Sequence, residues 1–222
     1  MIPDDIFARR LKPSGVPAKY RALRLPQWKP YNGASEMALA AAKEFVESFP
    51  DRWAASSVPD FSELIGKGLA LIGTPGAGKT TLTALTVMET ARRHNVVFVF
   101  TTMSDYIGKL LEQISLSPMV NAGDPRAIDR YWKIDDFKRR MYNAPLAGVD
   151  DVGKEHHTAS DFARDEVDKL LRARFRKGFP TVVNSNTPLA KWGDLYNPSM
   201  ESFVQEAFTS VTLGGRDLRR AA

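Results

Sequence analysis

Short apolar runs alternate along this chain with longer segments in which apolar residues recur every three or four positions. The short runs predict five β-strands, at 69–72, 96–100, 146–149, 181–183 and 210–213. The longer segments predict helices at 35–49, 79–94, 104–113, 160–177 and 200–208. Strands separated by helices are typical of a parallel sheet covered on both faces. We therefore expect an α/β protein with a five-stranded parallel sheet in three α/β/α layers.

Two segments lack this regular pattern. Residues 1–34 contain five prolines, and because proline fixes φ and removes a hydrogen-bond donor, we expect no long helix or strand there. The stretch IPDDIFARRL is predicted to be a frayed terminus, with one amphipathic turn around Ile6, Phe7 and Leu11 as the alternative. Residues 114–144 are polar, and within them we expect only a short helix from Ile134 to Met141.

Capping residues predict where several helices begin and end. Ser35 is expected to cap the helix over 35–49, and Pro50 to end it. Ser104 is expected to cap the helix that runs to Gln113. We divide the chain into an N-terminal extension with a linker helix, residues 1–60, and a core domain, residues 61–222.

Composition excludes several classes of protein. The chain has 43% hydrophobic and 26% charged residues, no cysteine, and no run that approaches the roughly 18 apolar residues of a membrane span. We expect a cytoplasmic protein with no membrane partner, no disulfide and no thiolate zinc site. His94, His156 and His157 have no metal-ligand spacing. The excess of 31 basic over 26 acidic residues is compatible with a polyanionic partner without requiring one.

The segment GTPGAGKTT follows a predicted strand and opens a predicted helix. Its glycines allow backbone N–H groups to surround phosphates at a helix N-terminus. In this spacing Lys79 reaches the β- and γ-phosphates and Thr80 binds magnesium, so ATP or ADP with Mg²⁺ is the expected ligand. The alternative is a glycine turn with a surface lysine. The predicted cofactor-binding residues are Gly73, Thr74, Pro75, Gly76, Ala77, Gly78, Lys79, Thr80 and Thr81.

Polar residues follow two further predicted strands. Asp150 and Asp151 end the apolar run LAGV, at the edge of a parallel sheet where ligands bind. Asp150 is expected to hold magnesium and Asp151 to orient and deprotonate the attacking water. The polar segment from Asn184 to Thr187 follows the next strand and could sense the γ-phosphate. Each stretch could instead be an ordinary turn, and Glu155 is a weaker acidic candidate.

With these pieces in place, the sequence resembles the AAA+ ATPases of the DnaC type, which are bacterial and phage replicative-helicase loaders, and the related IstB transposition helpers. The resemblance covers about 16–219 through VPAKYRALRL, GKGLALIGTPGAGKTTL, FTTMSDYIGKLLEQI, LAGVDDVGKE, LLRARFRKGFPTVVNSNTPL and FTSVTLGGRDLR. It implies a P-loop fold without a C-terminal helical lid. It also implies ATP-dependent placement of a replicative helicase on single-stranded DNA.

The resemblance further implies roles for individual residues. Gly73, Gly76, Gly78, Lys79 and Thr80 match the Walker A loop. Asp150 and Asp151 match the Walker B pair, with Asp151 as the catalytic acid, and Asn186 matches the sensor-1 asparagine. The resulting catalytic set is Lys79, Asp151 and Asn186, and the metal set is Thr80 and Asp150.

The sequence departs from this family in two ways. The helicase-gripping N-terminal region is missing or reduced to IPDDIFARRL, which favours a phage or prophage origin. The helix NPSMESFVQEAF has Ser202 and Phe203 where the family has an arginine that completes a neighbour's site. Such an arginine is worth roughly 10³ to 10⁵ in rate in other NTPases. We expect slow hydrolysis by a homo-oligomer, or a hetero-oligomer with a finger-supplying AAA+ subunit. Arg174, Arg176 and Arg216 are the candidate substitutes.

Basic residues alternate with aromatic ones in the polar region 126–140. Lys138, Arg139 and Arg140 are the predicted contacts to single-stranded DNA, since cations follow phosphates and rings stack on bases. The alternative is a solvated helix face. The alternatives for function are an IstB-like transposition helper, a small-molecule P-loop kinase and an ATP-binding adaptor that does not hydrolyse.

Overall fold

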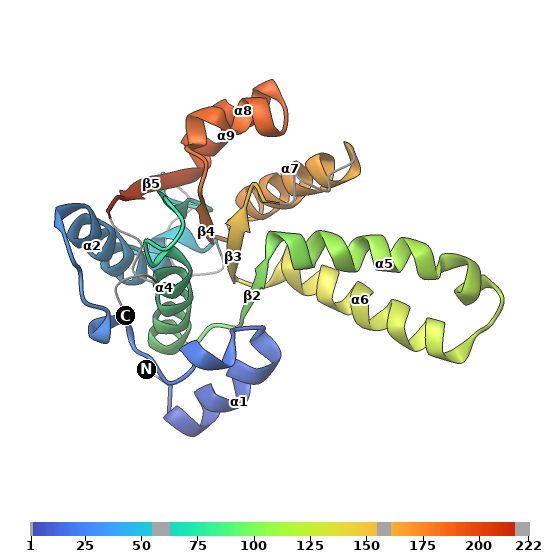
Figure 1. Cartoon of the computed structure of the whole chain (residues 1–222). Helices are drawn as coiled ribbons and strands as arrows, with labels where there is room; N and C mark the ends of the chain where they lie inside the picture. The colour runs from blue at the N-terminus through green and yellow to red at the C-terminus, as the bar shows by residue number, and fades with distance from the viewer. Residues whose placement is uncertain (1, 55–62, 155–160, 216–222) are drawn as a thin grey trace.

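A computed structural model describes residues 2–54, 63–154 and 161–215 of the 222-residue chain. Within them, one sheet contains β1 (Gly68–Gly73), β2 (Phe98–Thr102), β3 (Leu146–Val152), β4 (Thr181–Ser185) and β5 (Phe208–Leu213). All neighbouring strands are parallel, in the order β2-β3-β4-β1-β5 (Figure 1). The five predicted strands are confirmed. Because they are parallel, the ends of β1, β3 and β4 lie at one edge of the sheet.

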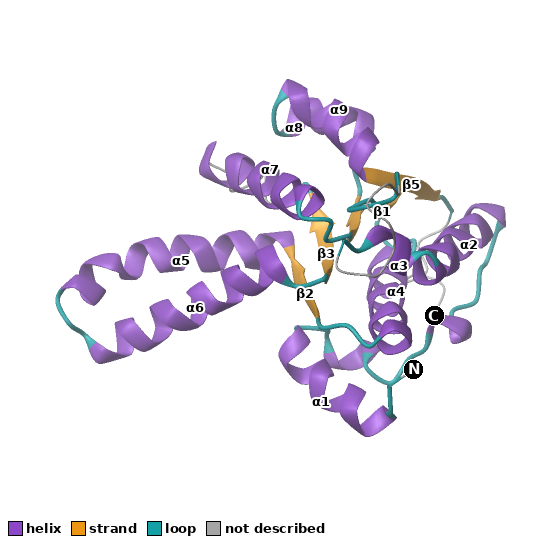
Figure 2. Ribbon diagram, turned by 180° about the vertical axis from the view of Figure 1, so that it is seen from behind, coloured by secondary structure: helices purple, strands orange, loops and turns teal. Residues whose placement is uncertain are grey.

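Helices cover both faces of this sheet (Figure 2). Alternate residues of β1 separate the two cores: Leu69 and Leu71 pack on one side, Ala70 and Ile72 on the other. The first core is covered by α1 (Asp4–Ser14), α2 (Gly33–Glu47), α3 (Phe49–Arg52) and α4 (Lys79–His94). The second is covered by α5 (Met103–Asn121), α6 (Pro125–Asn143), α7 (Asp161–Arg176), α8 (Trp192–Leu195) and α9 (Pro198–Ala207). The three-layer α/β/α prediction is therefore confirmed.

The segment predicted to be irregular, 114–144, is instead most of a helical hairpin formed by α5 and α6, which projects from the sheet (Figures 1 and 2). Pro118 lies in the last turn of α5, and Pro125 opens α6 behind its N-cap Asp124, so neither proline interrupts a helix centre. In α6 the buried residues Ala127, Ile134 and Met141 recur every seven positions. Because so few positions of α6 are buried, its sequence is mostly polar and does not show the usual pattern of an amphipathic helix.

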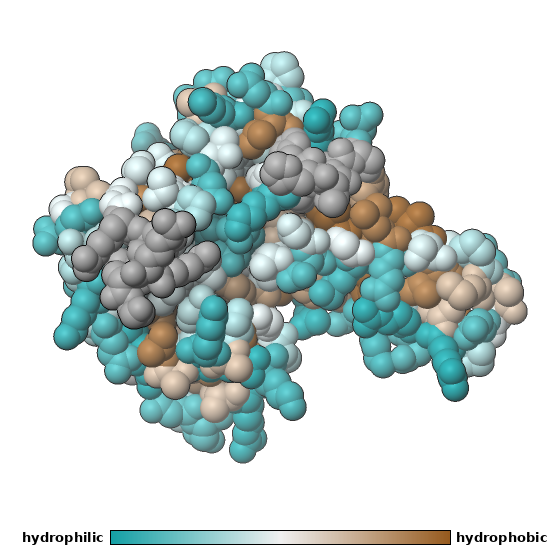
Figure 3. All heavy atoms as spheres, in the orientation of Figure 1, coloured by the Kyte–Doolittle hydropathy of each residue, from teal (hydrophilic) through white to brown (hydrophobic). Residues whose placement is uncertain are grey.

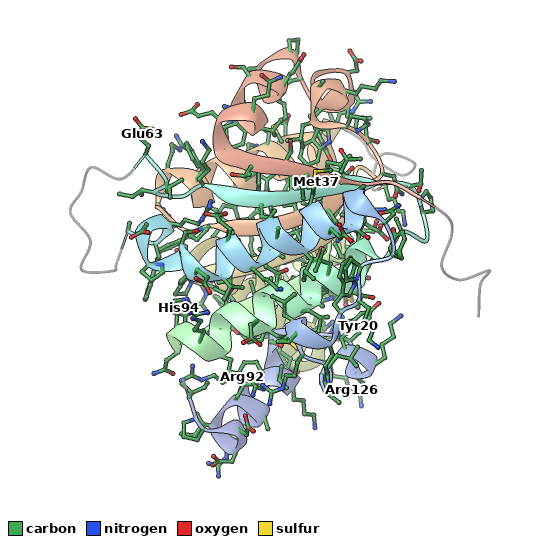
Figure 4. All side chains as sticks on the ribbon, turned by 90° about the vertical axis from the view of Figure 1, so that its left-hand side faces the viewer. Tyr20, Met37, Glu63, Arg92, His94 and Arg126 are labelled. Atoms are coloured by element: carbon green, nitrogen blue, oxygen red, sulfur yellow. The ribbon has the colours of Figure 1, made fainter. Side chains whose placement is uncertain are left out.

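The N-terminal prediction is also wrong, because Asp4–Ser14 forms an eleven-residue helix with Pro13 in its last turn. Phe7 and Leu11 are buried, and the Phe7 ring stacks on Phe98 of β2 with centroids 6.2 Å apart. Arg92 of α4 points toward α1 (Figure 4) and lies over the Phe7 ring, 4.4 Å from its centroid. The helix is thus part of the first core. The proposed domain boundary at 60/61 falls at 55–62, outside the described residues.

Three predicted helix boundaries shift by a few residues. The N-cap of α2 is Asn32 rather than Ser35: the Asn32 carboxamide accepts from Ser35 N–H, and the Ser35 hydroxyl accepts from Asn32 N–H. The N-cap of α5 is Thr102 rather than Ser104. Pro50 does not end α2, which stops at Glu47, but opens the short helix α3. For α2 and α5, a polar side chain further upstream than predicted satisfies the helix N-terminus.

The outer surface of the hairpin carries exposed apolar residues. Figure 3 shows hydrophobic side chains along α5, and Leu111, Ile114, Met119 and Trp132 are among the large apolar residues that are exposed. In the parts of the chain that the structure describes, no helix combines the length and apolar character of a membrane span.

Candidate nucleotide-binding site

The glycine-rich loop joins β1 to α4, as the sequence predicts. Gly76 and Gly78 have φ of 82° and 86°, a left-handed backbone that side chains disfavour, so the loop can curl tightly. The helix α4 begins at Lys79, and no side chain caps its N-terminus. An uncapped helix N-terminus behind a glycine loop is a site for phosphate groups.

A polar cavity of about 360 Å³ lies against this loop. It is lined by loop residues together with Asp151, Lys154 and Asn186, so the strand ends of β1, β3 and β4 meet there as predicted. A larger cavity of about 600 Å³ lies away from the loop, between Pro13, Val97 and Asn143, and its walls are mainly apolar. The smaller cavity is the candidate phosphate site because it combines the glycine loop with Lys79 and Lys154.

The Lys79 ammonium is held by three oxygen acceptors. It donates to the carbonyls of Gly73 (2.8 Å) and Thr74 (2.9 Å) and to Oδ1 of Asn186 (2.8 Å). The side chain is nearly buried, with 5% exposed. The predicted pair Lys79 and Asn186 therefore lies in direct contact, and phosphate oxygens could replace these acceptors one for one.

The acidic residues occupy an irregularity in β3. Between Val149 and Val152 the strand has one residue more than β4 has between Val183 and Ser185. Asp151 takes up the extra residue with φ of 56°, one of two non-glycine residues with positive φ in the described chain. As a result Asp150 is buried while Asp151 reaches the cavity.

Asn184 holds this bulge in place. Its amide Nδ2 donates to Asp150 Oδ1 (2.5 Å) and to Thr83 Oγ1 in α4 (2.9 Å), and its Oδ1 accepts from Asp151 N–H (3.1 Å). Asn184 is completely buried. Sequence reasoning singled out Asn186 and did not assign this role to Asn184; the available signal was an amide inside the apolar run TVVNS.

The environment of Asp150 suits a divalent cation. Burial raises the pKa of its carboxyl, and hydrogen bonds from Asn184 and Thr80 oppose that rise. The Thr80 and Asp150 side chains are therefore in contact, and their role in holding a metal ion stays a prediction. The described residues contain no group of three or more His, Cys, Asp or Glu that could hold a metal ion. A hydroxyl and one carboxylate nevertheless fit Mg²⁺, which commonly takes its other ligands from water and phosphates.

Asp151 has a cationic neighbour that the sequence analysis did not identify. Lys154 Nζ lies 2.6 Å from Asp151 Oδ2. The two side chains are 48% and 29% exposed, and both line the cavity. Glu155, His156 and His157 lie outside the described residues.

Arg174, one of the three arginines named above as candidate substitutes, is held inside the molecule. Arg174 is fully buried, and its guanidinium donates to Thr181 Oγ1 and to the carbonyls of Met141 and Pro180. It joins α7 to the sheet and has no route to another subunit. Arg176 is exposed on the same helix, and Arg216 lies outside the described residues.

The three predicted DNA contacts lie on α6 at the base of the hairpin. Arg139 pairs with Asp135 and Asp136, and Arg140 pairs with Asp136. Lys138 lies 4.0 Å from Glu166 on α7. These pairs reduce the free positive charge of this surface, and a role in DNA binding stays a prediction.

The chain has the P-loop α/β/α fold of AAA+ proteins, and in particular the fold of the solved DnaC-type helicase loaders. No family model matches the chain, and no curated protein matches its sequence.

Three solved structures are similar to this chain over nearly their whole length, and a fourth is similar over about half of its length. The DnaC helicase loader is 20% identical, with a TM-score of 0.65 over 89% of this chain and 99% of that one. DnaI is 18% identical, with a TM-score of 0.63 over 92% and 95%. A putative primosome component from Streptococcus pyogenes serotype M3 is 23% identical, with a TM-score of 0.61 over 96% and 98%. The replication initiator DnaA bound to AMPPCP and single-stranded DNA is 14% identical, with a TM-score of 0.62 over 91% and 52%.

Proposed function

We propose that this protein binds ATP with Mg²⁺ at the glycine loop and hydrolyses it while helping to place a replicative helicase on single-stranded DNA. The proposal is carried by two sets of contacts at one edge of the sheet. Lys79 donates to Asn186, and the Asp150 carboxylate accepts hydrogen bonds from Thr80 and Asn184. Lys79, Thr80 and Asn186 line one cavity, and Asp150 lies beside Thr80, so groups suited to phosphate and to a metal ion are close together.

The proposed roles follow from the geometry. The loop amides and Lys79 would hold the phosphates, and Thr80 and Asp150 would hold a magnesium ion, which would neutralise phosphate charge. Asp151 faces the cavity and would accept a proton from water at its carboxylate. Asn186 exchanges its contact with Lys79 for a contact to the γ-phosphate or the water.

The helicase-loader role rests on similarity of fold. The DnaC and DnaI structures are matched over 99% and 95% of their lengths, which supports this role. The exposed apolar residues on the hairpin offer a surface for a protein partner. Lys138, Arg139 and Arg140 remain the proposed contacts to single-stranded DNA.

An ATP-binding adaptor that hydrolyses slowly, or not at all, is the second candidate. The burial of Arg174 favours it, because that side chain cannot complete a neighbouring site. An IstB-like transposition helper would share the same cavity and differ in preferring duplex DNA. A hetero-oligomer in which another AAA+ subunit supplies an arginine would restore fast hydrolysis.

A binding experiment separates these functions. Purified protein is mixed with a purified replicative helicase, with AMPPCP, ADP or no nucleotide, and complex formation is followed by size-exclusion chromatography. We expect a complex that requires nucleotide, is lost in Lys79→Ala, and loads the helicase on single-stranded DNA. Nucleotide binding without helicase capture, together with a preference for duplex DNA, would instead support the transposition helper. Capture without measurable ATP turnover would support the adaptor.

A further inference from the structure

We propose that Lys154 detects the terminal phosphate of ATP: its ammonium pairs with Asp151 when no γ-phosphate is present and moves to that phosphate when ATP is bound. This inference rests on the proposed nucleotide binding and adds a specific contact within a single chain. It assigns a second lysine to the triphosphate, in addition to Lys79.

The backbone directs Lys154 into the cavity. Gly153, with φ of 98°, turns the chain directly after β3, and Lys154 N–H bonds to the carbonyl of Asp151 (3.3 Å). This turn brings the Lys154 side chain back over Asp151, with 2.6 Å between ammonium and carboxylate. The ammonium therefore lies beside the carboxylate proposed to activate water.

The ion pair between Lys154 and Asp151 can exchange partners easily. Both side chains keep contact with solvent, at 48% and 29% exposure, and pairs of this kind contribute little to stability. A γ-phosphate carries more negative charge than one carboxylate and offers three oxygen acceptors. Lys79, by contrast, is nearly buried and held by three acceptors.

The charge balance of the cavity favours this exchange. Asp150 and Asp151 bring two carboxylates to the edge where a triphosphate would lie. A cation that leaves Asp151 for the γ-phosphate lowers the repulsion between phosphate and protein. The same movement frees the Asp151 carboxylate to accept a proton from water. Lys154 would thus make the base available only when a γ-phosphate is present.

Nucleotide affinities test the proposal directly. The dissociation constants of AMPPCP and ADP, each with Mg²⁺, are measured by calorimetry for the full chain and for Lys154→Met. We expect the AMPPCP constant to rise roughly tenfold, the effect of one charge-assisted hydrogen bond, while the ADP constant changes less than about twofold. Lys154→Arg should retain most of the preference for AMPPCP. Lys169→Met removes another exposed, ion-paired lysine on α7 and should change neither constant.

The outcomes distinguish this inference from the proposed function. If the wild type binds neither nucleotide, the proposed function fails. If it binds both and Lys154→Met keeps the wild-type ratio of constants, or loses ADP and AMPPCP affinity equally, Lys154 does not read the terminal phosphate. The double variant Asp151→Asn/Lys154→Met provides a further check. Asp151→Asn should tighten AMPPCP binding in the wild type several-fold more than it does in Lys154→Met.

Discussion

The Asn184 amide donates a 2.5 Å hydrogen bond to the Asp150 carboxylate, and both side chains are buried. Asn184→Ala removes this bond and also the bonds to Thr83 and Asp151 N–H. Because buried polar groups would lose their partners, we expect the free energy of unfolding to fall by about 1–3 kcal/mol. Urea denaturation measures this change. Asn121→Ala changes an exposed asparagine at the end of α5 and, as the control, should leave stability nearly unchanged; equal losses in both variants would contradict the role of Asn184.

Nucleotide binding predicts a stability change that depends on Lys79. With ATP analogue at 100 times its dissociation constant, the wild type should gain about 2.7 kcal/mol in the free energy of unfolding. Lys79→Ala should still be folded without nucleotide, and it should show a cooperative unfolding transition. Its free energy of unfolding should rise by almost nothing when the ATP analogue is added. Thermal unfolding with and without AMPPCP and Mg²⁺ is the measurement. A full gain in Lys79→Ala would exclude Lys79 from the phosphate site.

The raised pKa of Asp150 predicts a pH dependence. Burial disfavours the ionised Asp150 carboxylate in the folded protein. The folded protein is therefore stabilised at low pH, where Asp150 is protonated, and loses this stability as pH rises through the raised pKa. Asp150→Asn should therefore be more stable than the nucleotide-free wild type at neutral pH. The same substitution should abolish the Mg²⁺ dependence of nucleotide binding. Denaturation and calorimetry as functions of pH and Mg²⁺ test both effects, and a less stable variant would contradict the first.

A buried carboxylate fixes the base of the hairpin. Glu166 of α7 accepts hydrogen bonds from the hydroxyls of Tyr106 in α5 (2.7 Å) and Tyr142 in α6 (2.8 Å). Burial raises the pKa of both tyrosines far above the usual range, and the Glu166 carboxylate adds to that rise. We expect alkaline absorbance titration to show two tyrosines that resist ionisation, and Glu166→Gln to lower the pKa of both. Ionisation of all six tyrosines near their usual pKa would rule out this network.

Salt dependence tests the basic residues on α6. Binding to single-stranded DNA should weaken as salt rises, and the slope should be smaller when Lys138, Arg139 and Arg140 are all changed to alanine. The control changes three exposed lysines elsewhere, Lys29, Lys43 and Lys191, and should keep the wild-type slope. An unchanged slope in the α6 variant would exclude this surface from the DNA site.

Local sequence signals predicted the strands and the glycine loop, because apolar runs and glycine spacing act over a few neighbouring residues. The α5–α6 hairpin was missed because its helices bury narrow stripes and carry prolines near their ends, where helices tolerate them. The helix α1 was missed because its stability comes from distant contacts with Phe98 and Arg92.

The details of the site depend on contacts that sequence distance hides. Asn184 and Thr83 are 101 residues apart, and only the folded structure shows that Thr83 accepts a hydrogen bond from the amide that also holds the Asp150 carboxylate. The pairing of Lys154 with Asp151 depends on a bulge and a glycine turn that no apolar pattern signals. The identities of the candidate phosphate and acid residues came from the sequence, whereas their supporting contacts came from the structure.

The left-handed backbone at Asp151 limits which residue types this position accepts. Asparagine, aspartate and glycine enter that conformation most readily, whereas longer side chains meet a steric penalty of about 1–2 kcal/mol. Of the three tolerated types, only aspartate is an acid. A glutamate, although its carboxylate would extend further, would have to adopt a conformation that its side chain disfavours. Among acidic residues, the main chain beside Asp150 therefore favours the shorter one, independently of any catalytic requirement.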